Sequence, residues 1–174
     1  MRDASRTLVI EHPVDAIRSA RVWHCKYRTL APLASCAHLR TLVVGTYPDD
    51  NLRILESFPE LRYLRILHMP KITNLDSISS LRRLDTLSLA TAVEWDRRKR
   101  VQTVRSLEPI AALPSLRHLE LFGIVDHTGS LRSLHGIPAL KSARVSGYSD
   151  NDLRAFYAAT HAVDEFNPSP DLGG

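Results

Sequence analysis

Among the residues that could carry chemistry, His118 and Glu120 have the most useful spacing. If this stretch is a strand, side chains two positions apart share a face, so an imidazole and a carboxylate could exchange a proton there. The eight histidines form no HExxH motif, the two cysteines are not at zinc spacing, and neither a glycine-rich phosphate loop nor a GxSxG elbow occurs. Phe122 follows on the same face and favours a binding contact over catalysis. The sequence therefore predicts no enzyme, no metal and no cofactor.

Arginines gather in two places, and the first is a run that also holds a tryptophan. Trp95 precedes Arg97, Arg98 and Arg100 in this run. Such a segment is either a solvated flap with its tryptophan folded back on the scaffold or a secondary contact element for a partner. Both interpretations stay open.

The second group of basic residues, the arginine row, has one member in each of six similar stretches of the chain. Its positions are Arg18, Arg40, Arg62, Asp85, Arg117 and Lys141. Such a row could follow the phosphates of RNA or another polyanion. However, Asp85 interrupts it, no stacking aromatic recurs with it, and the net charge is only +4. Binding of RNA or a polyanion is therefore the alternative function and not the leading one.

The elements that position these residues repeat along the chain. Leu61, Leu64 and Ile66 show a spacing of apolar residues that returns from starts at positions 17, 39, 84, 116 and 140. The starts are 22, 22, 23, 32 and 24 residues apart. A fixed period of this size indicates a solenoid, in which each repeat buries its apolar face against its neighbours.

Each predicted strand follows a stretch with an apolar residue at every third position, as in Leu52, Leu55 and Phe58. This spacing is typical of a short 3₁₀ or helical turn with one buried stripe. Proline follows the stripe at Pro59, and again at Pro114 and Pro138, where it would end a helix before the next strand.

With these two signatures, the chain resembles the leucine-rich repeat family. The unit LxxLxxLPxLRxLxL is readable almost intact in Leu107–Leu121, and the resemblance covers about 17–148. It implies a right-handed α/β solenoid of the bacterial type, with 22–24-residue repeats, a parallel concave sheet and short helical turns on the convex side. The family usually has Asn or Cys at the third position after the last strand leucine. The residues at that position here are Cys25, Tyr47, Met69, Ala92, Ile124 and Tyr148. We therefore expect no asparagine ladder and an apolar filling of these turns.

The repeats account for most of a single domain that spans 1–174. The sequence predicts an N-terminal cap at 1–16, six repeats at 17–148 and an inserted loop at 92–104. The C-terminal cap at 149–166 should contain a helix that begins after Ser149 and buries one face against the last repeat. A flexible tail is expected at 167–174.

Alternation along the strands then defines three columns of side chains that point out of the concave sheet. The first column is Ser19, Thr41, Tyr63, Thr86, His118 and Ser142. The second column is Arg21, Val43, Arg65, Ser88, Glu120 and Arg144. The third column is Trp23, Gly45, Leu67, Ala90, Phe122 and Ser146.

Aromatic rings among arginines are typical of the centre of a protein interface. The predicted partner-binding residues are Arg21, Trp23, Val43, Tyr63, Arg65, Leu67, His118, Glu120, Phe122 and Arg144. Two alternatives to a partner-binding surface stay open: a cap or the inserted loop folds over the sheet, or the apolar residues are scattered and have no function.

The composition indicates the source and the cellular location of the protein. Lysine occurs only four times among 23 basic residues, which favours a bacterial source, and cysteine pairs typical of secreted caps are missing. The sequence has no secretory signal pattern and no apolar run long enough to span a membrane. We expect a cytoplasmic monomer that binds a protein partner, as an inhibitor or immunity protein or as an adaptor.

Overall fold

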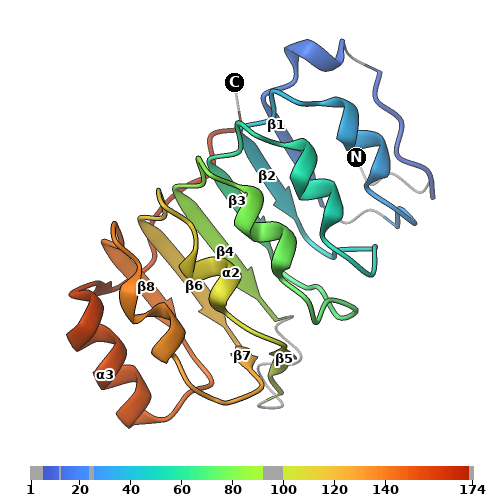
Figure 1. The fold of residues 1–174 in the computed structure, drawn as a ribbon. Coiled ribbons are helices and arrows are strands. Elements are labelled where there is room, and N and C mark those ends of the chain that lie inside the picture. The colour runs from blue at the N-terminus through green and yellow to red at the C-terminus, as the bar shows by residue number, and fades with distance from the viewer. Residues whose placement is uncertain (1–5, 12, 24–25, 92–99, 173–174) are drawn as a thin grey trace.

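The computed structural model describes residues 6–11, 13–23, 26–91 and 100–172. Their main feature is a parallel sheet of seven strands in the order β1-β2-β3-β4-β6-β8-β9 (Figure 1). The strands are β1 (Ser19–Val22), β2 (Thr41–Val44), β3 (Tyr63–Ile66), β4 (Thr86–Ala90), β6 (His118–Phe122), β8 (Ser142–Val145) and β9 (Val163–Asp164).

The register of the sheet follows the sequence period. Thr41 pairs with Tyr63, Tyr63 with Thr86, and Thr86 with His118, so equivalent positions of successive repeats lie side by side. Consequently the strand leucines stack beneath the sheet. Leu42, Leu64, Leu87 and Leu119 are fully buried. This continuous apolar row replaces the spherical core of an ordinary domain.

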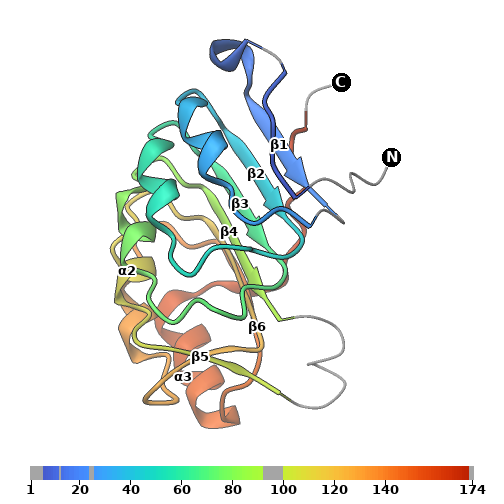
Figure 2. The ribbon, with the colours of Figure 1, turned by 90° about the vertical axis from the view of Figure 1, so that its right-hand side faces the viewer.

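Short helical turns cover the convex side of the sheet (Figure 2). They are η1 (Val14–Ala16), η2 (Ala31–Ser35), η3 (Arg53–Ser57), η4 (Asp76–Ser80), α2 (Glu108–Ala111) and η5 (Arg132–Gly136). The apolar stripe predicted at every third position points inward, since Leu55, Ile78, Ile110 and Leu134 are all fully buried. Each turn is closed by i→i−3 bonds such as Leu55 N–H to Leu52 O, 2.9 Å.

The fourth repeat adds a small second sheet beside the first. Strand β5 (Gln102–Val104) pairs in parallel with β7 (Ile124–Asp126). Residues 102–104 therefore form a strand, where the sequence predicted the end of an inserted loop. The turn from β6 into β7 passes through Gly123, whose φ is +69°. A Cβ there would lie 2.5 Å from the Thr91 hydroxyl, so a larger residue would strain the backbone and displace the Thr91 side chain.

The last repeat is covered by helix α3 (Asp150–Thr160), as predicted. Ser149 is its N-cap and accepts a hydrogen bond from Asp152 N–H at 3.1 Å. Phe156 is fully buried on the inner face of this helix. The chain then forms β9, which extends the concave sheet by one short strand.

After β9 the chain crosses back over the concave side of the sheet. Residues 165–172, called the closing segment below, run from the last strand to β1, on the side opposite the helical turns (Figures 1 and 2). Ser19 Oγ donates to Leu172 O at 2.7 Å, and Tyr63 Oη donates to Pro168 O at 3.5 Å. The sequence predicted a flexible tail at 167–174; residues 167–172 of it lie along the sheet, and its flexibility stays a prediction.

Candidate functional site

The three predicted columns lie on the concave sheet, because the register aligns each of them strand by strand. They differ in what covers them. The first column lies near the amino ends of the strands, where the closing segment crosses. The second and third columns lie further along the strands. The second column combines buried residues with the exposed Arg21 and Arg144, and the third column, apart from the buried Ala90, is partly exposed. Together these exposed and partly exposed residues form the more open part of the face.

Glu120 lies at the centre of the second column and is the charged group around which neighbouring side chains are arranged. It is 5% exposed, and Ser88 Oγ donates to its Oε2 at 2.5 Å. Arg65 and Arg144 flank it, with nitrogen–oxygen distances of 3.9 and 3.7 Å. A buried carboxylate needs such partners because removal from water disfavours its charge. The two guanidinium groups are thereby held at defined positions on the face.

Two aromatic rings of the third column each have an arginine guanidinium group stacked on one face. The Arg21 guanidinium carbon lies 4.9 Å from the centre of the Trp23 ring, and that of Arg144 lies 5.0 Å from the Phe122 ring. Both rings are partly exposed, as is Leu67 between them. Cation–π contacts of this kind stiffen both side chains and keep a flat apolar surface next to a charge.

Two predicted contact residues are far less exposed than the sequence suggested. Tyr63 is 6% exposed and Val43 is 4% exposed, so neither faces open solvent. The reason for Tyr63 is the closing segment, which accepts its hydroxyl hydrogen bond through Pro168 O. Burial, the largest cause, raises the pKa of Tyr63 above its usual value of 10.0, since the charged phenolate loses hydration. The roles of both residues in binding a partner stay predictions.

The histidine of the candidate acid–base pair has a different partner in the structure. His118 Nδ1 lies 2.9 Å from Ser142 Oγ on the neighbouring strand, while the Glu120 carboxylate contacts Ser88, Arg65 and Arg144. The arrangement ties two strands together in the first column and holds Glu120 in ion pairs. His118 and Glu120 are therefore each engaged in structural contacts with other residues and not with each other.

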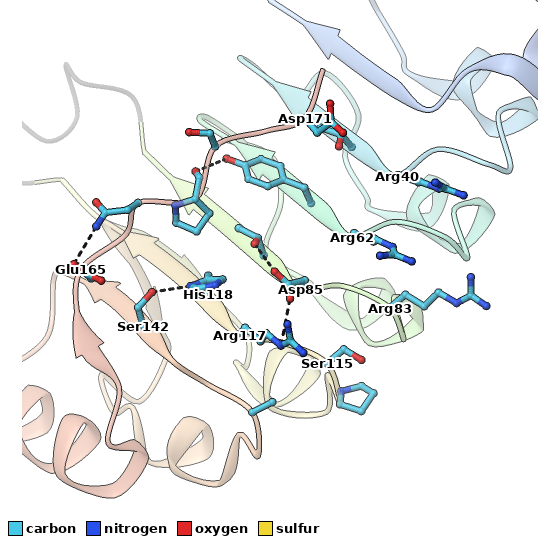
Figure 3. A pocket seen from close by; sticks show the side chains of 18 residues that line it. Arg40, Arg62, Arg83, Asp85, Ser115, Arg117, His118, Ser142, Glu165 and Asp171 are labelled. Atoms are coloured by element: carbon cyan, nitrogen blue, oxygen red, sulfur yellow. Dashed lines mark hydrogen bonds and ion pairs between the residues drawn. The ribbon is translucent and has the colours of Figure 1, made fainter. Parts of the chain in front are cut away.

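The arginine row borders an open pocket of about 1040 Å³ between the row and the closing segment (Figure 3). Arg40, Arg62, Arg83 and Arg117 line its outer side, and Glu165 and Asp171 of the closing segment line the other. Arg117 pairs with Asp85 at 3.5 Å, and Arg40 with Glu60 at 3.3 Å. Among the described residues, Arg62 and Arg83 form no ion pair, so they are available to an anionic group.

The basic run that was the second candidate contact lies mostly outside the described residues. Trp95, Arg97 and Arg98 belong to this undescribed part. Arg100 is described and exposed, two residues before β5. Its role as a contact stays a prediction.

The described residues contain no group of three or more His, Cys, Asp or Glu side chains that could hold a metal ion. Within the same part of the chain, no helix is both long and apolar enough to cross a membrane.

Comparisons with known proteins bear on the fold alone. No family model matches the chain, and no curated protein matches its sequence. Among solved structures, an internalin (inlF) from Listeria monocytogenes superposes with a TM-score of 0.60 at 16% identity. The superposition covers 83% of this chain and 38% of that one. A second, internalin C2 from the same species, gives a TM-score of 0.49 at 21% identity, over 70% of this chain and 52% of that one.

The chain has the leucine-rich repeat fold. The parallel strands, the buried repeat leucines and the convex turns all agree with this assignment. This leucine-rich repeat chain spans only about 38% of the internalin chain it matches.

The turns where the resemblance would place asparagine are filled in another way. Tyr47, Met69 and Ile124 are buried there. A glutamine also contributes: Gln102 is 6% exposed, and its amide nitrogen donates to Met69 O and Ile72 O, both at 2.6 Å. It reaches this leucine-rich repeat turn from β5, so sequence spacing alone did not indicate it.

Sequence reasoning missed the closing segment as part of the site. One signal was present, since apolar residues and prolines alternate with polar ones in Phe166, Pro168, Pro170 and Leu172. These four are partly buried, whereas the residues between them are exposed. Alternation of this kind marks an extended segment with one face against a surface.

Proposed function

We propose that this leucine-rich repeat chain is a non-catalytic protein-binding module that recognises its partner through the open part of the concave sheet. The observation that carries the proposal is the pair of rings with stacked guanidinium groups, Arg21 on Trp23 and Arg144 on Phe122. Aromatic residues and arginine are enriched at the energetic centres of protein interfaces.

The surface is also prepared for binding before the partner arrives. Glu120 fixes Arg65 and Arg144, and the sheet beneath is a rigid parallel array. Side chains that are already ordered lose little entropy on association, so more of the contact energy appears as affinity. In this role Trp23, Leu67 and Phe122 are the apolar anchors, while Arg21, Arg65, Arg144 and Glu120 select the charge of the partner.

We further propose that the module works as an inhibitor or immunity protein or as an adaptor, inside a bacterial cell. Support for this finer proposal comes from the open curved sheet, which provides a recognition surface without a water-excluding pocket. It also comes from the composition, with few lysines and no cysteine pairs of a secreted cap.

Binding of a polyanion through the arginine row is the second candidate, favoured by the pocket that Arg40, Arg62, Arg83 and Arg117 line. Salt distinguishes the two functions. Affinity for RNA falls steeply and linearly with the logarithm of salt concentration. A protein complex centred on Trp23 and Phe122 tolerates salt, because its main contacts are apolar and aromatic.

The test is capture of a partner from a lysate of the source organism, with the full chain and with Phe122→Ala/Arg144→Ala as bait. We expect the variant to lose the protein that the full chain captures. A matched control on the convex side, Arg53→Ala/Ile54→Ala, should retain it. Thermal melting of both variants checks that each is folded. Retention by the concave variant and loss by the convex one would contradict the proposal.

A further inference from the structure

The closing segment occupies a channel on the concave face that the proposed partner could also use. It lies over the first column, in which Thr41, Tyr63, Thr86 and Ser142 are 4%, 6%, 3% and 5% exposed and Ser19 and His118 are partly buried. The segment reaches across the sheet from β9 to β1, so that Ser19 bonds a residue 153 positions away. The first column therefore forms the floor of a channel that accepts an extended chain.

The channel holds this chain mainly through features that many peptides share. The hydrogen bonds that Tyr63 and Ser19 donate from the sheet both go to backbone carbonyl oxygens of the segment. Pro168 and Pro170 favour the extended conformation in advance and lack an N–H group that would need a partner. Recognition of this kind depends on backbone shape and on alternate side chains, as in other extended peptide complexes.

The charge of the residues around the channel sets a second requirement for a bound peptide. Glu165 and Asp171 face the pocket that the arginine row borders, and Arg62 and Arg83 form no ion pair among the described residues. A carboxylate of a bound peptide could pair with either guanidinium group. The channel thus favours an extended peptide that contains proline and acidic residues.

We propose that this channel binds an extended, proline-containing acidic segment of the partner protein, and that the closing segment occupies it in the free chain. The inference rests on the proposed function and names the chemistry of one part of the partner. Because the closing segment is tethered, its effective concentration is on the order of millimolar, and the partner must displace it. The partner then binds both the channel and the open columns beside it.

The test uses the full chain and a fluorescent synthetic peptide with the sequence of residues 165–172. In one variant the inward-facing residues of the closing segment are changed, as Pro168→Gly/Pro170→Gly/Leu172→Gly, which frees the channel without altering its floor. The matched control, Asn167→Gly/Ser169→Gly, changes exposed residues of the same segment, which alternate with those that lie against the floor. Fluorescence anisotropy measures binding of the peptide to each.

We expect the peptide to bind the freed variant about tenfold more tightly than the unchanged chain or the control, because tethered competition is removed only there. Adding Arg62→Ala/Arg83→Ala to the freed variant should weaken binding and reduce its salt dependence. A peptide with glycine in place of both prolines should bind more weakly, because it loses its preset conformation.

Three outcomes overturn the inference. Equal binding to all three chains shows that the channel is not the site, and absence of binding to the freed variant shows that the channel takes no peptide in trans. Dimers that form as the unchanged chain is concentrated, seen by sedimentation, show that a second copy is the occupant. If capture of the partner still depends on Phe122 and Arg144 in any of these cases, the proposed function stands and only this inference fails.

Discussion

The two halves of the concave face are built from the same repeats, but they differ in what lies over them. The covered half is the first column, and the open half is the second and third columns. Over the first column, the closing segment covers Tyr63 and bonds Ser19. Over the third column, Trp23 and Phe122 stay partly exposed and carry arginines. The difference teaches that a strand position in a solenoid fixes the direction of a side chain, whereas its exposure also depends on the neighbouring side chains and on what crosses the face.

The covered half lies under a chain segment with no fully buried residue, and the open half is held by a charge network. Glu120 on β6 contacts Arg65 on β3, Ser88 on β4 and Arg144 on β8, and so joins four strands. Side chains of the sheet donate hydrogen bonds to backbone oxygens of the closing segment, from Ser19 at 2.7 Å and from Tyr63 at 3.5 Å. Residues 165–172 are all exposed or only partly buried, and such segments open at a lower free energy than the rest of a domain. We therefore expect the covered half to rearrange more readily than the open half.

The largest expected effect comes from the core that both halves share. Leu64→Ala removes a fully buried side chain beneath β3, and such a change costs about 2–5 kcal/mol of the free energy of unfolding. Chemical denaturation measures it. Because the repeats stack on one another, both halves should lose stability together. A loss below about 1 kcal/mol would show that the strands are not packed as one array.

A smaller loss of stability is expected in the open half alone. Glu120→Ala leaves Arg65 and Arg144 without their carboxylate and should lower the free energy of unfolding by about 1–3 kcal/mol. Glu120→Gln is the control, because it keeps an acceptor for Ser88 and should cost less. Hydrogen exchange should show faster opening around β6 and no change in the closing segment. Equal loosening of both regions would remove the distinction between them.

Ser19→Ala should act on the covered half alone. It removes the hydrogen bond to Leu172 O, whose net contribution is about 0.5–1.5 kcal/mol, and the cost should appear as local opening of the closing segment. Hydrogen exchange at the backbone amides of residues 166–172 measures it, while chemical denaturation should change little. Ser146→Ala, on the open half, is the matched control and should leave these amides as they are.

The smallest effect is a pH dependence of folding stability, which reports whether the closing segment covers Tyr63. Burial raises the pKa of Tyr63, so the unfolded chain releases this proton at lower pH than the folded chain. The stabilising contribution is thus fully present below pH 10.0, the ordinary value, and is lost as the pH rises through the folded pKa. Phenolate absorbance, compared with that of Tyr63→Phe, follows the titration. The freed variant with glycine at 168, 170 and 172 should show a Tyr63 pKa closer to 10.0. An unchanged pKa would show that the closing segment does not cover this ring.

Much of the fold could be predicted from the sequence, because a solenoid is specified by local patterns. The starts at 39, 61 and 84 place their strands in the register that the structure shows. Ser149 marked the beginning of α3, since its side chain caps the first turn. The second sheet was not predicted, because β5 pairs with β7 across 22 residues and lies in an insertion with no repeat period.

The candidate site was predicted in part. The outward direction of Trp23, Arg65 and Phe122 followed from alternation along each strand. The burial of Tyr63 did not, since it depends on a segment 105 residues away in the chain. In the same way Gln102 reaches the turn at Met69 from another strand, and its two hydrogen bonds have no counterpart in the spacing of the repeats.

The sequence by itself determined which side chains pack under the sheet and which point out of it, because a strand alternates its faces and each repeat contacts only its neighbours. The tertiary structure alone decided which outward-pointing residues remain accessible. That outcome depends on the path of the chain after its last repeat, where Leu172 returns to Ser19 across every strand of the sheet. A contact over such a distance is set by the length and curvature of the whole stack, and no local pattern encodes it.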